Sequence, residues 1–167
     1  PVSDRAKSSI FSIIGSDIVD KRILDLYAGS GSFGIEALSR GARECTFIDN
    51  SSYAVIDIKA NLVKTRLQEK ATVLRRKAFQ FLEDAEPGSF DIVFADPPYE
   101  FYKEGQHRMA RLLNATEPVL DNRGAIIIKH HRRIDIPDNN HMIIIDKRHI
   151  GSNTISLWTA RCFHHLR

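Results

Sequence analysis

The sequence predicts an α/β fold, with a mainly parallel sheet of seven strands, an antiparallel edge strand and helices on both faces. Short apolar runs typical of buried strands alternate along the chain with amphipathic stretches typical of helices. The last two apolar runs, 142–146 and 154–161, have no helix of crossover length between them, which favours an antiparallel pair at that edge. We find no internal repeat and no linker, and a length of 167 residues suits one domain covering 1–167.

The predicted elements follow one another in a regular order. Ser3 can cap a first helix, which carries Ile10 and Ile14 on one face and stops at Gly15. Strands are expected at 22–28, 44–49, 71–75, 90–95, 125–130, 142–146 and 154–161. Helices are expected from a glycine-rich turn to about residue 40, over 51–67, over 78–84 and near 105–116.

The charge balance allows nucleic-acid binding without proving it. The chain has 24 basic and 21 acidic residues, a formal net charge of +3 and a pI of about 9.0. Basic residues cluster where they could neutralise phosphates, at 75–77, 129–133, 147–149 and 161–167. These clusters could equally be the solvated rims of strands.

Other features indicate an ordinary cytoplasmic protein. No apolar run approaches the roughly 20 residues of a membrane helix, and no secretory signal is visible. We therefore expect no membrane partner and reduced thiols at Cys45 and Cys162. The histidine pairs 130–131 and 164–165 lack a completing ligand cluster, so we expect exposed or RNA-facing imidazoles and no metal. A monomer is expected because no long exposed apolar stripe is evident.

A glycine-rich turn follows the first predicted strand. Residues 29–34 read Gly-Ser-Gly-Ser-Phe-Gly, a GxGxxG pattern that opens a helix. Such glycines allow a tight turn beside a ligand, and Asp49 at the end of the next strand can accept hydrogen bonds from ribose hydroxyls. This supports any adenosine cofactor, including NAD. Asp25 beside the turn favours S-adenosylmethionine, which carries an ammonium and a sulfonium where NAD carries a pyrophosphate.

The sequence Asp96-Pro97-Pro98-Tyr99 ends the strand predicted at 90–95. Ligands of open α/β sheets bind outside the carboxyl ends of the strands, so this turn should share one crevice with the glycine turn. An exocyclic base amine is a poor nucleophile until its lone pair faces the methyl donor. Asp96 and the Pro97 carbonyl could grip that amine, Pro98 would keep the turn rigid, and Tyr99 could stack on the base. Phe101 could close over the base or be buried.

Residues 25–42, Asp-Leu-Tyr-Ala-Gly-Ser-Gly-Ser-Phe-Gly-Ile-Glu-Ala-Leu-Ser-Arg-Gly-Ala, resemble the cofactor motif of the bacterial 16S ribosomal RNA guanine-N2 methyltransferase family, the small-subunit rRNA methyltransferase D type. Residues 1–5, 90–99 and 150–154 also resemble segments of that family, so the resemblance covers nearly the whole chain. It implies a Rossmann-like class I methyltransferase fold. The implied reaction transfers a methyl group from S-adenosylmethionine, leaving S-adenosylhomocysteine, to the N2 amine of a guanine. The implied partner is 16S rRNA, within the small ribosomal subunit or an assembly intermediate.

The resemblance also implies the site. It places Gly29 and Gly31 at the methionine end of the cofactor, Asp49 at the ribose and the segment around Ala78 at the adenine. The catalytic residues expected are Asp96, Pro97, Pro98 and Tyr99. The cofactor-binding residues expected are Asp25, Tyr27, Gly29, Gly31, Phe33, Gly34, Asp49, Asn50, Lys77, Ala78 and Phe79.

Departures and alternatives remain open. The family often has Asp-Ala where this chain has Lys77-Ala78, which puts adenine recognition by that side chain in doubt. The family's basic segment ahead of Pro1 is absent, so we expect the chain to lack a short N-terminal RNA-binding segment. A DNA adenine or cytosine amino-methyltransferase would use the same turn. A nucleotide-binding module of the NAD type and a non-catalytic RNA-binding factor are the remaining alternatives.

Overall fold

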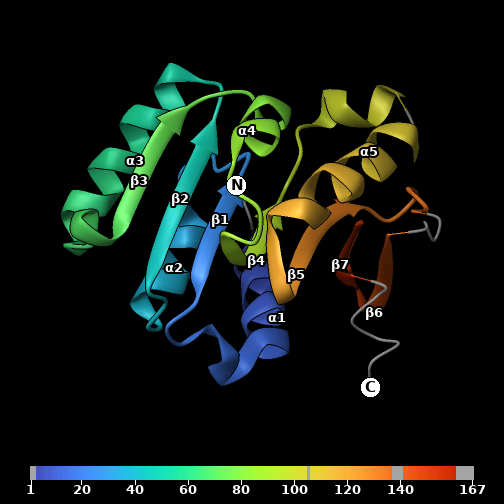
Figure 1. Ribbon diagram of the computed structural model, residues 1–167, viewed down its shortest axis with the longest axis horizontal. Helices are drawn as coiled ribbons and strands as arrows, with labels where there is room; N and C mark the ends of the chain where they lie inside the picture. The colour runs from blue at the N-terminus through green and yellow to red at the C-terminus, as the bar shows by residue number, and fades with distance from the viewer. Residues whose placement is uncertain (1–2, 105, 137–140, 161–167) are drawn as a thin grey trace.

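The computed structural model describes residues 3–104, 106–136 and 141–160 (Figure 1). The strands are β1 (Arg22–Leu26), β2 (Glu44–Asp49), β3 (Ala71–Arg75), β4 (Phe90–Ala95), β5 (Leu120–His131), β6 (Met142–Ile150) and β7 (Asn153–Ala160). The α-helices are α1 (Asp4–Ile14), α2 (Ser32–Ser39), α3 (Ser52–Thr65), α4 (Ala78–Asp84) and α5 (Gln106–Thr116). Short 3-10 helices are η1 (Gly15–Ile18), η2 (Gln68–Lys70), η3 (Tyr99–Glu104) and η4 (Glu117–Val119).

Local sequence signals set several helix ends. The Ser3 hydroxyl accepts a hydrogen bond from the Ala6 amide at 3.2 Å, and Gly15 takes φ 57° where α1 stops. Ser51 caps α3 in the same way, with 3.3 Å between its hydroxyl and the Ala54 amide nitrogen. The predicted helix starts at these two serines are therefore confirmed.

The seven strands form one sheet in the order β3-β2-β1-β4-β5-β7-β6. Neighbouring strands from β3 through β5 pair in parallel, whereas β7 runs antiparallel to both β5 and β6. The predicted mainly parallel sheet with an antiparallel pair at one edge is confirmed. The antiparallel strand itself is β7, which lies between β5 and the edge strand β6.

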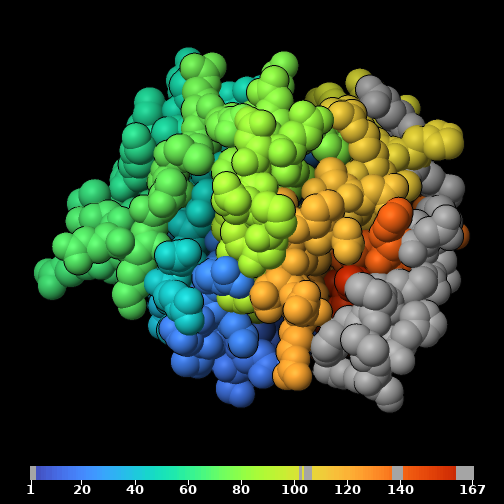
Figure 2. All heavy atoms as spheres, viewed as in Figure 1, coloured from blue at the N-terminus to red at the C-terminus, as the bar shows by residue number. Residues whose placement is uncertain are grey.

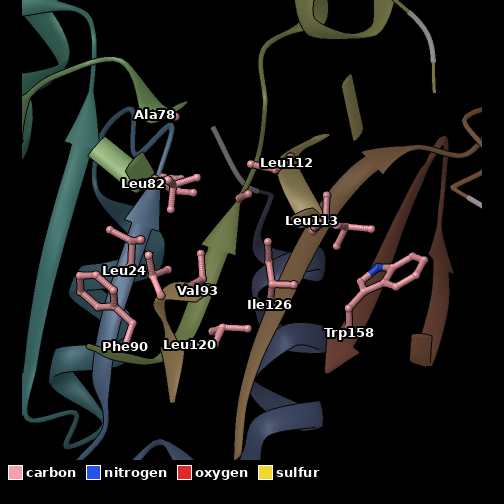
Figure 3. Packing of buried hydrophobic residues seen from close by; sticks show 14 of the residues in the cluster. Leu24, Ala78, Leu82, Phe90, Val93, Leu112, Leu113, Leu120, Ile126 and Trp158 are labelled. Atoms are coloured by element: carbon pink, nitrogen blue, oxygen red, sulfur yellow. The ribbon is translucent and has the colours of Figure 1, made fainter. Parts of the chain in front are cut away.

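Two apolar layers cover the faces of this sheet, because successive strand residues point to opposite sides. On one face α4 and α5 pack on Leu24, Val93 and Ile126, with Trp158 at the far end of the cluster (Figure 3). On the other face α1, α2 and α3 pack on residues that include Ile23. Figure 2 shows the lime-green segment from α4 toward β4 over the middle of the sheet, with β5 in orange beside it.

Some predicted boundaries differ from the structure. The first strand ends at Leu26, because Tyr27 takes φ 56° and starts the glycine turn. Strand β6 continues to Ile150 through the exposed basic residues 147–149, since its pairing with β7 uses backbone groups and needs no apolar side chain. The 3-10 helix η3 was not predicted.

Two predictions about single residues have different outcomes. Cys45 is a buried thiol, as predicted, whereas Cys162 lies outside the described residues. The prediction of an exposed imidazole is wrong for His130, which is 3% exposed. Its side chain lies on the same face of β5 as the buried Ile126 and Ile128. The histidines 164–165, the basic segment 161–167 and residues 1–2 also lie outside the described part of the chain.

Candidate active site

The crevice lies at the carboxyl ends of β1 and β4, which are neighbours in the sheet. It consists of two adjoining cavities that share Tyr27, Asp96 and Pro98. The first, the turn cavity, has a volume of about 630 Å³ and includes Asp25, Ala28, Gly29, Ser30, Ser32, Phe33, Ala54, Asp57, Phe94, Pro97 and Lys129. The second, the helix cavity, has a volume of about 620 Å³ and includes Ile48, Asp49, Asn50, Arg76, Lys77, Ala78, Phe79, Gln80, Glu83, Arg108 and Arg111.

The Asp49 carboxylate is hydrogen-bonded to the glycine turn and to the residue that precedes α3. One carboxylate oxygen of Asp49 accepts from the Gly29 amide and the other from the Ser51 amide, each at 2.9 Å. Gly29 and Gly31 take φ 59° and 80°, a backbone conformation that favours glycine. A Cβ added to Gly29 would meet nothing within 4 Å, so its place beside the turn cavity is open space.

Gly34 has a packing reason for lacking a side chain. A Cβ there would lie 2.4 Å from the Phe47 ring and 2.7 Å from the Cys45 sulfur. Gly31 is also packed, with Phe47 and Ile58 atoms 3.3 Å from an added Cβ. Neither glycine is among the residues that line the two cavities. The turn therefore combines one glycine open to the cavity with two that allow α2 and α3 to approach the sheet.

Asp25 lies beneath the turn and is 1% exposed. It accepts a hydrogen bond from the Gly34 amide at 3.1 Å, which ties β1 to the start of α2. Burial raises the pKa of Asp25 well above its ordinary value, and the nearby Asp96 and Asp49 carboxylates act in the same direction. Phe33 is also buried and stacks on Phe94 with ring centroids 4.1 Å apart.

In the Asp-Pro-Pro-Tyr turn, Asp96 and Pro98 line both cavities and Pro97 lines the turn cavity, whereas Tyr99 is not among the residues that line either one. Pro97 is buried, Pro98 is exposed, and Tyr99 is 73% exposed. The Asp96 side chain is 22% exposed, and the Lys129 ammonium lies 3.5 Å and 3.4 Å from its two oxygens. Burial raises the pKa of Asp96, although the charge and hydrogen bonds of Lys129 pull that pKa down.

The helix cavity brings together the predicted residues Asp49, Asn50, Lys77, Ala78 and Phe79. Their convergence follows from the parallel order of β1, β2 and β3, whose carboxyl ends meet at one edge. Burial raises the pKa of Tyr27, which separates the two cavities, to about 12.

Two arginines of α5 border the helix cavity and were missed in the sequence. The Arg108 guanidinium lies 4.8 Å from the Phe101 ring centroid, and that of Arg111 lies 4.0 Å from the Phe79 ring centroid. Phe101 is 1% exposed, so the buried alternative predicted for it is confirmed. The available signal was the spacing of the arginines, which places both on one face of α5.

Lys129 is the other residue that the sequence did not assign to the site. It was grouped with a basic cluster, although it follows a buried run on the strand beside β4. Within residues 3–104, 106–136 and 141–160, no group of three or more potential ligands could hold a metal ion. Over the same part of the chain, no helix has both the length and the apolar character of a membrane span.

Known proteins are similar to this chain in sequence. YlbH of Bacillus subtilis is 35% identical over 165 residues, which cover 96% of this chain and 88% of YlbH. Ribosomal RNA small subunit methyltransferase D of Haemophilus influenzae is 37% identical over 103 residues, which cover 60% of this chain and 53% of that protein. The match thus spans about half the length of the methyltransferase D protein.

Solved structures are also similar to this chain. The solved structure of yhhF from Escherichia coli aligns with a TM-score of 0.79 and 27% identity, over 96% of this chain and 86% of that one. This likeness and the strand order identify the fold as Rossmann-like. The family described as Conserved hypothetical protein 95 matches residues 1–159. The chain therefore belongs to this family, which is of the small-subunit rRNA methyltransferase D type.

Proposed function

We propose that this protein transfers a methyl group from S-adenosylmethionine to the exocyclic N2 amine of a guanine in 16S ribosomal RNA. The observation that carries the proposal is that Asp96, Pro97 and Pro98 line one cavity together with the Gly29 turn. The relatives' names support the broader reaction class, since methyltransferase D acts on small-subunit ribosomal RNA by name and YlbH bears the name of an rRNA methyltransferase. The choice of guanine N2 rests on the resemblance of residues 25–42 to the guanine-N2 methyltransferase family.

The two cavities fit an elongated cofactor with a charged end and an adenosine end. Each oxygen of Asp49 accepts one backbone amide, which leaves lone pairs for the ribose hydroxyls. Ala78 and Phe79 offer apolar surface for the adenine, and the open space at Gly29 admits the methionine end. Asp25 and Asp57 supply carboxylates in the turn cavity, where an ammonium group would bind.

Bound S-adenosylmethionine supplies an electrophilic methyl group on a sulfonium and leaves as S-adenosylhomocysteine. Asp96 and the Pro97 carbonyl accept hydrogen bonds from the two N–H groups of the target amine. The lone pair of that amine then faces the methyl group. A new N–C bond forms as the S–C bond breaks, and the electron pair of that bond stays on sulfur. Asp96 stabilises the positive charge that develops on nitrogen and takes the released proton.

The Tyr99 ring provides a surface on which the target base can stack. Tyr99 is 73% exposed and directly follows Asp96, Pro97 and Pro98 in the chain. A target base taken out of its stack can lie on this ring while its amino edge reaches Asp96.

The test is transfer of labelled methyl groups from S-adenosylmethionine to small ribosomal subunits that lack the modification, followed by nucleoside analysis. We expect the label in N2-methylguanosine. Label in a methylated adenosine or cytidine would contradict the choice of guanine, and faster transfer to duplex DNA than to ribosomal substrates would contradict the RNA assignment.

The matched variant is Asp96→Asn, which keeps the shape of the side chain and removes its charge. We expect a loss of at least about 10²-fold in transfer, the lower range for a group that accepts a proton in the transition state. Affinity for S-adenosylhomocysteine, measured by calorimetry, should stay within a few-fold. Wild-type turnover by Asp96→Asn would refute the proposed mechanism.

A further inference from the structure

The sheet register brings Lys129 and Asp96 together. Strands β4 and β5 pair in parallel with Ala95 opposite Ile128, so the residues that follow each of them lie side by side at the carboxyl edge. The Lys129 ammonium lies 3.5 Å and 3.4 Å from the two oxygens of Asp96. Both side chains are largely enclosed, with 14% of Lys129 and 22% of Asp96 exposed.

We propose that Lys129 is a positioning residue that keeps Asp96 ionised and aimed into the crevice. The inference rests on the proposed function, in which the two oxygens of Asp96 receive the hydrogen bonds and the proton of the target amine. No motif of the sequence assigned this role to Lys129, which belongs to a strand 33 positions further along the chain.

An ionised Asp96 matters because its neutral form would fail in two ways. A protonated carboxyl group carries a donor where an acceptor is needed, and it cannot take up a second proton. Burial favours this neutral form and raises the pKa of Asp96, whereas Lys129 opposes the shift. An enclosed carboxylate at this position therefore needs a cation close to it.

Among the charged or titratable residues that line the two cavities, Lys129 is the one placed to stabilise the negative charge of Asp96. Asp25 on β1 supplies no positive charge, and burial together with the charges of Asp96 and Asp49 raises its own pKa. Lys129 is the cation whose ammonium lies within hydrogen-bonding distance of both Asp96 oxygens. The remaining charged or titratable residues that line the two cavities are Tyr27 after β1, Asp49 after β2, Asp57 on α3, Arg76, Lys77 and Glu83 around α4, and Arg108 and Arg111 on α5.

The geometry of the pair also leaves Asp96 available to a ligand. A tight charged hydrogen bond between nitrogen and oxygen is about 2.7–2.9 Å long, so the contacts at 3.4 Å and 3.5 Å are loose. Lys129 therefore exerts its charge on Asp96 without occupying the carboxylate fully. The amine of a bound base can form the shorter contacts.

The experiment compares Lys129→Met with Lys129→Arg over a range of pH. In Lys129→Met the Asp96 carboxyl should ionise only at higher pH, so the acid limb of kcat/KM should move to higher pH. At neutral pH we expect kcat/KM to fall by up to about 10²-fold, as for a displaced catalytic group. In Lys129→Arg the acid limb of the kcat/KM profile should return most of the way to its wild-type pH, because this variant keeps the positive charge. The exposed Lys59→Met on α3 is the control for loss of one positive charge and should leave the profile unchanged.

A second measurement does not depend on turnover. The carboxyl carbon of Asp96, followed by NMR in the free protein and identified with Asp96→Asn, should titrate at higher pH in Lys129→Met than in the wild type. If Lys129→Met does not fold, Lys129→Gln takes its place. An unchanged acid limb and an unchanged Asp96 titration would overturn the inference while leaving the proposed function intact. Transfer at the wild-type rate by Asp96→Asn would instead overturn the role that the proposed function gives to Asp96.

Discussion

Replacing Gly34 with alanine tests whether the third glycine of the turn serves packing. The added Cβ would lie 2.4 Å from one Phe47 ring carbon, 2.7 Å from another and 2.7 Å from the Cys45 sulfur. Phe47 is 0% and Cys45 1% exposed, so neither side chain can swing into solvent. Overpacking of this kind costs about 1–3 kcal/mol, and these contacts place the cost in the upper half. Replacing glycine with alanine inside a helix also stabilises the folded state by about 0.5–1 kcal/mol, which offsets part of this cost.

The net expectation is a loss of about 1–2.5 kcal/mol in the free energy of unfolding. For a chain of this size that corresponds to a melting temperature about 2–10 °C lower. Urea unfolding followed by circular dichroism measures it, with the exposed Ser39→Ala on the same helix as a control that should change little. The double variant Gly34→Ala/Phe47→Leu should recover about 1 kcal/mol relative to the sum of the single changes. A Gly34→Ala protein as stable as the wild type, or a cycle without coupling, would refute the packing explanation.

Three further changes have defined outcomes. Asp91→Ala removes three hydrogen bonds from Arg22 and should cost about 2 kcal/mol at pH 7. Burial raises the pKa of Asp91 but Arg22 outweighs it and leaves that pKa low, so the loss measured by urea unfolding should shrink below about pH 4. Asp49→Ala frees the Gly29 and Ser51 amides and should weaken S-adenosylhomocysteine binding about 10- to 100-fold in calorimetry, and a change under twofold would contradict that role. Tyr99→Ala should lower kcat/KM for RNA about 10- to 100-fold through lost stacking, with unchanged cofactor affinity.

The sequence was sufficient for the parts of the molecule that depend on local patterns. Ser3 and Ser51 mark helix starts through their side-chain hydrogen bonds, and α4 has the predicted bounds 78–84. The crevice was also predictable, because strand ends at one edge of a parallel sheet must meet. That reasoning alone placed Asp49 and Asp96 near the glycine turn.

The remaining features depend on contacts between distant segments. The pairing of Lys129 with Asp96 follows from the register of β5 on β4, which no short sequence window contains. His130 is buried because of the face of β5 on which it lies, whereas its polar side chain led to the prediction of an exposed imidazole. Likewise, Gly34 looked like a ligand-binding glycine, and only the position of Phe47 on β2 shows its packing role.

The position of β1 in the sheet has a consequence for how the protein is made. β1 pairs with β2 on one edge and with β4 on the other. A chain that emerges from its N-terminus can form the first pair while β4 is still being synthesised, and the second edge of β1 then exposes unpaired backbone groups. The two walls of the crevice come from opposite sides of this late junction. A ligand that touches both Gly29 and Asp96 can therefore bind only after β4 has paired with β1.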